Sequence, residues 1–150
     1  MTFDIRGPWG EEEAARFLGA VSIPIRLACV GADGFPRVVS LWYRYEAGNF
    51  YCVTHRDSKL TTLLRRNEKV GFEVSPNEPP YQGVRGQGIV TLHEDGGAET
   101  LNAHLQRYLG GTSSSLARWL LSRADEELLV QITVKRLFCW DYRERMTQAG

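Results

Sequence analysis

The 150-residue sequence has no excess of charge of either sign, because 18 acidic side chains balance 18 basic ones. A broad nucleic-acid-binding surface needs clustered lysine and arginine, so we expect any anion site to be small and local. The apolar runs are far shorter than the ~20 residues that span a bilayer. Residues 1–20 hold three consecutive glutamates and lack the apolar core of a signal peptide. These absences predict a cytoplasmic protein that binds neither nucleic acid nor a membrane.

Cysteine is also scarce, with only Cys29, Cys52 and Cys139, each in an apolar, strand-like run. An odd number of widely spaced cysteines is typical of small buried side chains in a reducing compartment, and not of a disulfide framework. The three histidines form no closely spaced ligand pair such as HxxxH. We therefore expect no metal site.

The 43% apolar content suits a single domain, residues 1–150, with one hydrophobic core. Alternating apolar residues and turn signals predict six strands, and helical spacing predicts the segments between them. The predicted strands are 23–31, 37–46, 50–54, 69–74, 83–94 and 127–140, and the predicted helices are 11–20, 58–66, 98–110 and 114–124. The first three strands are expected to form an antiparallel meander. The whole pattern predicts a mainly β, α+β fold built as a small barrel.

Two local features of this pattern carry further expectations. The fifth strand contains Gly83, Gly86 and Gly88, which indicate a bend or a place where another group comes close to the backbone. The helix 58–66 is bounded by good capping residues, with Asp57 and Ser58 as candidates at its start and Asn67 at its end.

The start of the helix 58–66 gathers the basic residues His55, Arg56 and Lys59. A cation there is mildly unfavourable, because this end of the helix dipole is already positive. It becomes favourable if an anion binds the free amides of the first turn, where Ser58 could add a hydroxyl hydrogen bond. A phosphate monoester fits this arrangement, and the alternative is a basic helix end that is simply solvated.

Taken in order, the segments resemble the pyridoxamine 5′-phosphate oxidase-like, flavin-binding split-barrel proteins over roughly residues 12–145. The resemblance rests on "DGFPRVVSLWYRY", "NFYCVTHRDSKLTTLLRRNEKVGFEV", "GVRGQGIVTL" and "VQITVKRLFCWDY". Its most distinctive part is the "SK" pair before a leucine-bearing helix and "RRN". It implies a six-stranded antiparallel split β-barrel with short connecting helices.

The resemblance also implies FMN as the cofactor and a homodimer with cofactor sites at its interface. The strand 37–42 would lie along the flavin ring, and Ser58 and Lys59 would grip the phosphate. Arg85 and Gln87 would approach from the opposite wall or the second subunit, and an aromatic residue of the last strand would contact the flavin. The implied cofactor-binding residues are Arg37, Val38, Val39, Ser40, Leu41, Trp42, Ser58, Lys59, Arg85, Gln87 and Trp140.

The C-terminal end departs from the oxidase proper. The sequence "WDYRERMTQAG" lacks the histidine of the oxidase's Arg-Leu-His-Asp-Arg stretch, and Arg143 and Arg145 match it only loosely. Vitamin B6 oxidation is therefore not expected. The ending resembles the subgroup that uses FMN or the deazaflavin coenzyme F-420 to reduce small organic substrates.

The leading hypothesis is an oxidoreductase that moves a hydride between this cofactor and a small-molecule substrate. The alternatives are a deazaflavin-dependent reductase and a non-catalytic flavin- or heme-binding protein. No catalytic residue is assigned, because the cofactor ring itself carries the redox chemistry. Four aromatic residues could stack on the ring or the substrate: Trp42, Tyr43, Tyr81 and Trp140. The alternative for each of them is ordinary core packing.

Overall fold

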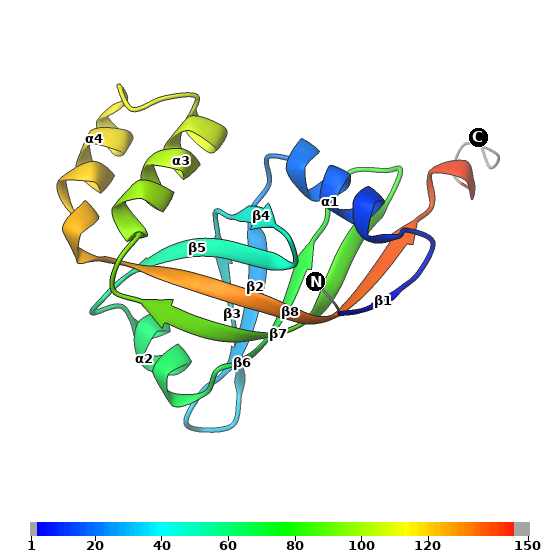
Figure 1. Ribbon diagram of the computed structural model, residues 1–150, viewed down its shortest axis with the longest axis horizontal. Helices are drawn as coiled ribbons and strands as arrows, with labels where there is room; N and C mark the ends of the chain where they lie inside the picture. The colour runs from blue at the N-terminus through cyan, green and yellow to red at the C-terminus, as the bar shows by residue number, and fades with distance from the viewer. Residues whose placement is uncertain (1–2, 146–150) are drawn as a thin grey trace.

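A computed structural model describes residues 3–145, in which eight strands form one curved, mostly antiparallel sheet (Figure 1). The strand order is β3-β2-β6-β7-β8-β5-β4, and β1 pairs in parallel with β8. The strands are β1 (Asp4–Arg6), β2 (Ile25–Val30), β3 (Pro36–Leu41), β4 (Arg44–Glu46), β5 (Asn49–His55), β6 (Lys69–Val74), β7 (Gln82–His93) and β8 (Glu127–Asp141). The fold is a split β-barrel, as predicted, with more strands than the six expected.

The helices lie around the sheet. They are α1 (Glu11–Ala20), α2 (Lys59–Arg66), α3 (Gly97–Leu109) and α4 (Ser115–Ser122), followed by the 3-10 turn η1 (Ala124–Glu126). Figure 1 shows α3 and α4 as a hairpin at one end of the sheet, where α3 packs on β5 and β8. No helix within residues 3–145 is long and apolar enough to cross a membrane.

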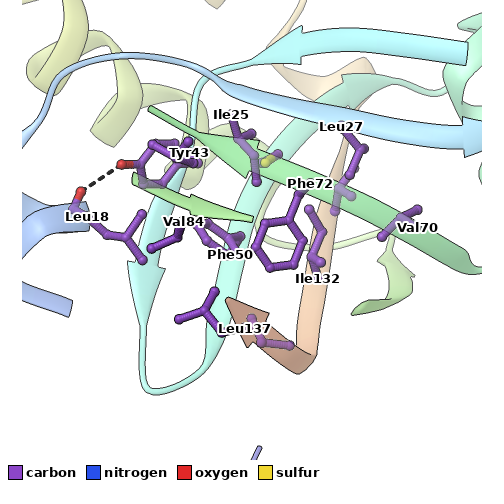
Figure 2. Close-up of a cluster of buried hydrophobic side chains, with 14 of the residues drawn as sticks. Leu18, Ile25, Leu27, Tyr43, Phe50, Val70, Phe72, Val84, Ile132 and Leu137 are labelled. Atoms are coloured by element: carbon purple, nitrogen blue, oxygen red, sulfur yellow. Dashed lines mark hydrogen bonds between the residues drawn. The ribbon is translucent and has the colours of Figure 1, made fainter. Parts of the chain in front are cut away.

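The core fills the inside of the curved sheet (Figure 2). On β5 every second residue is buried, as period-two side-chain alternation requires. Phe50 of β5 lies with its ring centroid 4.9 Å from that of Phe72 and 5.4 Å from that of Tyr43. The Tyr43 hydroxyl donates a 2.8 Å hydrogen bond to the carbonyl of Leu18, which ties α1 to the barrel. The three cysteines are buried and free, which confirms their prediction as core side chains.

The glycines of β7 lie where other groups approach the backbone, as predicted. A Cβ atom on Gly86 would stand 2.2 Å from the carbonyl oxygen of Arg136, and one on Gly88 would stand 2.9 Å from that of Thr133. The register between β7 and β8 also shifts between Gln87 and Gly88. Glycine at these positions therefore lets the long strand bend around the barrel.

Two strand predictions were wrong. The expected strand 37–46 is broken after Leu41, because the Tyr43 N–H donates to the hydroxyl of Tyr108 and not to a neighbouring strand. After this break the chain crosses to the other side of the barrel, so β3 pairs with β2 while β5 pairs with β4 and β8. Both antiparallel hairpins of the expected meander are present, β2 with β3 and β4 with β5, but its middle strand is divided in two. The three-residue strand β1 was missed because it is too short to show a period.

Candidate functional site

The outward face of β3 is where the first predicted site residues lie. Val39 and Leu41 pack against the core, whereas Val38 is 68% exposed and Ser40 is also exposed. Ser40 accepts a 3.1 Å hydrogen bond from the guanidinium of Arg26 on the neighbouring strand β2. Alternation thus divides the implied segment 37–42 into core residues and residues that a ligand can reach.

A groove runs across the outer face of the sheet next to Val38. We call it the sheet groove; it has a volume of about 630 Å³ and is lined by Arg26, Ala28, Val38, Gly71, Phe72, Glu73, Arg85, Gly86, Gln87, Arg136 and Phe138. The structure therefore brings Arg85 and Gln87 of β7 to the same hollow as Val38 of β3. The Arg85 guanidinium lies 4.5 Å from the ring centroid of Phe138 and 5.7 Å from that of Trp140, so Trp140 stands beside the groove.

A second hollow, the hairpin cavity, lies between the end of β3, the end of β5 and the α3–α4 hairpin. Its volume is about 380 Å³, and it is lined by Pro24, Ser40, Leu41, Trp42, Val53, Thr54, His55, Leu101, His104, Leu120 and Glu127. Ser40 lines this cavity and is bonded to Arg26, which lines the sheet groove. The two hollows therefore adjoin at the Ser40–Arg26 hydrogen bond.

The start of α2 lies next to the hairpin cavity. The Ser58 hydroxyl caps the helix by accepting the Thr61 N–H at 3.1 Å, and it lies 2.7 Å from the hydroxyl of Thr54, a cavity residue. The backbone N–H groups of Lys59 and Leu60 have no hydrogen-bond partner within residues 3–145. The Lys59 ammonium is exposed and likewise forms no ion pair with any described residue. Two free amides and a lysine without an ion pair therefore belong to the first turn of this helix.

The other basic residues near this helix end already have partners within the described residues. The Arg56 guanidinium forms ion pairs with Glu94 at 3.2 Å and with Glu126 at 3.1 Å. The His55 Nδ1 atom accepts the Asp57 N–H at 3.1 Å. Sequence reasoning counted these side chains as part of one cationic cluster, but the acidic partners of Arg56 lie far along the chain. Of Arg56 and Lys59, only Lys59 has no ion-pair partner within residues 3–145.

Arg37 stands apart from these residues. Its guanidinium forms an ion pair with Asp33 at 3.1 Å in the turn between β2 and β3. The two hydrogen bonds from Arg37 hold the pKa of the Asp33 carboxyl below its usual value. Arg37 lines neither hollow, so the structure does not bring its side chain to the groove or the cavity.

His104 of α3 is a cavity residue that sequence reasoning did not select. It is 1% exposed, its Nε2 atom bonds the carbonyl of Tyr51 at 3.1 Å, and its Nδ1 atom has no partner within the described residues. Burial lowers the pKa of His104 to about 4, so the ring is neutral at pH 7. The spacing of His104 from Leu101 and Leu105 on the buried face of α3 was the available signal.

The remaining aromatic and C-terminal candidates lie elsewhere. Tyr43 is fully buried in the core, and Tyr81 is 45% exposed and lines neither hollow. Arg143 forms a 2.7 Å ion pair with Asp141, which also accepts the indole N–H of Trp9 at 3.1 Å. The hydrogen bonds from Arg143 lower the pKa of Asp141 to about 2. This cluster joins the N-terminal segment to the end of β8, and its residues line neither hollow.

Comparisons with protein-family models and with curated proteins found no match. Solved structures match over most of the chain. A conserved hypothetical protein from Mycobacterium tuberculosis matches with a TM-score of 0.78 and 23% identity, over 93% of this chain and 89% of its own. An F420 reductase matches with a TM-score of 0.70 and 17% identity, over 87% of this chain and 97% of its own.

A FAD-binding protein from Mesorhizobium loti matches with a TM-score of 0.62 and 23% identity, over 86% of this chain and 92% of its own. All three likenesses lie below 25% identity and describe the fold. The chain therefore has the split-barrel fold of the pyridoxamine 5′-phosphate oxidase-like proteins, as the sequence resemblance predicted.

Proposed function

We propose that the protein is a flavin-type oxidoreductase that binds FMN, or alternatively coenzyme F-420, and transfers a hydride between the cofactor and a small organic substrate. One observation carries this proposal: the Lys59 ammonium and the N–H groups of Lys59 and Leu60 have no partner within residues 3–145 and meet beside a ligand-sized cavity. A helix N-terminus with a free cation is suited to a phosphate group, which both cofactors carry.

The neighbouring strand fits the rest of such a cofactor. From the start of α2, the ligand would pass Thr54 and lie along the outward side of β3 at Val38, Ser40 and Trp42. Arg85, Gln87 and Trp140 would contact it from the side of the sheet groove, either in the same chain or across an interface. The bound cofactor would supply the redox chemistry, and these residues would bind and orient it. The solved structures named for F420 and for FAD support a cofactor of this class.

We also propose that the sheet groove is the contact between two copies of the chain. Val38 and Phe138 expose 68% and 40% of their surface and line the same groove, and apolar side chains exposed together often mark a contact with another protein. Val38→Lys should shift sedimentation toward the 17 kDa monomer, whereas Leu116→Lys on the exposed side of α4 should not. A monomer at micromolar concentration in the wild type would contradict the dimer.

The free buried cysteines support a reducing, cytoplasmic location.

Titration of the protein with FMN and with coenzyme F-420, followed by fluorescence quenching, tests the cofactor site. Lys59→Ala should weaken binding about tenfold or more, because one charge-assisted contact of about 1.5–3 kcal/mol is lost. Arg16→Ala, which removes an exposed cation from α1, is the matched control and should change nothing. Equal affinities of wild type and Lys59→Ala would remove the phosphate site.

A second experiment separates the enzyme from the non-catalytic alternative. The loaded protein is reduced and mixed with quinones or nitro compounds, and reoxidation is compared with that of the free cofactor. Faster reoxidation on the protein supports an oxidoreductase, and equal rates throughout the panel support a binding protein. A Soret band after addition of hemin would favour the heme-binding alternative instead.

A further inference from the structure

We propose that the hairpin cavity is the substrate subsite, and that it takes a flat, uncharged, largely apolar molecule with one O–H or N–H donor. This inference rests on the proposed function, since the cofactor is placed along the adjoining face of β3. Ser40 and Trp42 belong both to that face and to the cavity wall. A molecule in the cavity would therefore lie beside the cofactor ring.

The walls of the cavity determine the polarity of its ligand. Trp42, Val53, Leu101 and Leu120 give it apolar sides, and its volume of about 380 Å³ is that of a small ligand site. No lysine or arginine lines it among the described residues, but the carboxyl group of Glu127 does. An anionic group inside the cavity, near His104 and Glu127, would lose its hydration without gaining a lysine or arginine, because the free Lys59 ammonium is not among the lining residues. The interior should therefore exclude anions, which would bind at the start of α2 instead.

His104 determines which polar group the ligand should carry. Its Nε2 atom contacts a carbonyl, the oxygen of Tyr51, so Nε2 must bear the hydrogen of the neutral ring. Nδ1 is then a hydrogen-bond acceptor, and it is buried without a donor within residues 3–145. Buried acceptors are normally paired in folded proteins. An O–H or N–H donor of a bound molecule would complete this pair.

The packing of the hairpin gives the ligand a way to reach His104. The small cluster of Leu101, Leu105 and Ala117 joins α3 to α4 and is separate from the main core. Leu120 projects from α4 into the cavity wall and is only partly buried. Because Nδ1 is closed off from solvent, we expect a ligand to reach it by displacing Leu120.

Three matched probes test the subsite in the full-length protein without cofactor. They are 2-naphthol, which has a donor, 2-methoxynaphthalene, which lacks one, and the anion 2-naphthoate. We expect 2-naphthol to bind about tenfold tighter than 2-methoxynaphthalene, the ratio produced by leaving one buried acceptor unpaired. In Lys59→Ala, which lacks the free cation beside the cavity, 2-naphthoate should bind most weakly of the three. Equal affinities of the first two probes, or preferred binding of the anion by Lys59→Ala, would overturn the proposal.

Variants locate the binding. His104→Leu should abolish the preference for 2-naphthol, and Leu120→Trp should fill the cavity and weaken binding of both neutral probes at least tenfold. Leu116→Trp, on the exposed side of the same helix, is the control and should bind them as the wild type does. Unchanged binding by Leu120→Trp would place the probes elsewhere.

If His104→Leu does not fold, the nitrogen chemical shifts of the imidazole in the wild type give the same answer. Addition of 2-naphthol should shift the His104 Nδ1 resonance, and 2-methoxynaphthalene should not; no shift with 2-naphthol overturns the proposal. The outcome is separable from that of the cofactor site, since a failed FMN and F-420 titration would leave the probe results unaffected.

Discussion

Trp42 and Tyr108 stack face to face, with ring centroids 5.3 Å apart and 9° between the ring planes. The Tyr108 hydroxyl accepts the Tyr43 N–H at 3.2 Å and lies 3.0 Å from the carbonyl oxygen of Ile23, to which it donates. One side chain of α3 thus holds the break after β3, the segment before β2 and the indole that lines the hairpin cavity. The position of α3 and the shape of the candidate site are therefore linked.

The hydroxyl and the ring of Tyr108 should contribute separately. We expect Tyr108→Phe to lower the free energy of unfolding by about 1–3 kcal/mol, because the Tyr43 N–H and the Ile23 carbonyl lose a partner. Tyr108→Leu should cost a further ~0.5–1.5 kcal/mol, because the stack with Trp42 is also lost. Urea denaturation of the three proteins measures both steps. Equal stability of Tyr108→Phe and the wild type would mean that the hydrogen bonds of the Tyr108 hydroxyl contribute nothing to the free energy of unfolding.

Two helix caps separate stability from binding. The Ser58 and Ser114 hydroxyls accept the third backbone N–H of α2 and α4, at 3.1 and 3.0 Å. Each serine-to-alanine change should cost about 0.5–2 kcal/mol of stability. Only Ser58→Ala should also weaken FMN or F-420 binding, because only Ser58 lies at the proposed phosphate site. Equal affinities of the two variants for the cofactor would contradict a role for Ser58 there.

The buried His104 should make the protein less stable in mild acid. Its pKa is lowered to about 4 by burial, from an ordinary value of 6.5, so protonation favours the unfolded chain. The stabilisation is fully present above pH ~6.5 and is lost as the pH falls toward 4. We expect this group alone to remove about 2 kcal/mol between pH 7 and pH 5.

Urea denaturation at both pH values, compared between the wild type and His104→Gln, isolates this contribution. The glutamine cannot titrate but keeps a donor that can serve the Tyr51 carbonyl. The variant should therefore lose less stability than the wild type on acidification. Parallel losses in the two proteins would show that other groups cause the acid sensitivity.

Replacement of glycine by alanine should have opposite effects on stability at two positions, Gly86 and Gly19. Gly86→Ala should cost at least about 2 kcal/mol, because the new Cβ would stand 2.2 Å from the Arg136 carbonyl oxygen and 2.7 Å from the ring of Phe72. Gly19→Ala in α1 has nothing within 4 Å and should raise stability by up to about 1 kcal/mol. Thermal or urea unfolding of both variants checks the pair, and a neutral Gly86→Ala would show that β7 can move away from β8.

The sequence predicted helix and strand bounds correctly where the interactions that set them join residues close together in the sequence. Helix α2 begins after its N-cap Ser58, whose hydroxyl accepts a backbone N–H of the first turn, and ends before its C-cap Asn67. Strand β6 has the bounds predicted for it, residues 69–74. The same holds for the cysteines, since an apolar run that alternates in burial places every second side chain inside. Such features depend on residues within a few positions of one another, so the sequence alone determined them.

The tertiary structure alone decided which side chains remain free to act. Arg56 is neutralised by Glu94 and Glu126, whereas Lys59, three residues further on, is not. The break after β3 depends on Tyr108, and the unpaired Nδ1 of His104 depends on what the α3–α4 hairpin excludes. Ion pairing, hydrogen bonding and burial are short-ranged in space but join residues far apart in sequence. The candidate site could therefore be named in part from its motif, and completed only once the chain was folded.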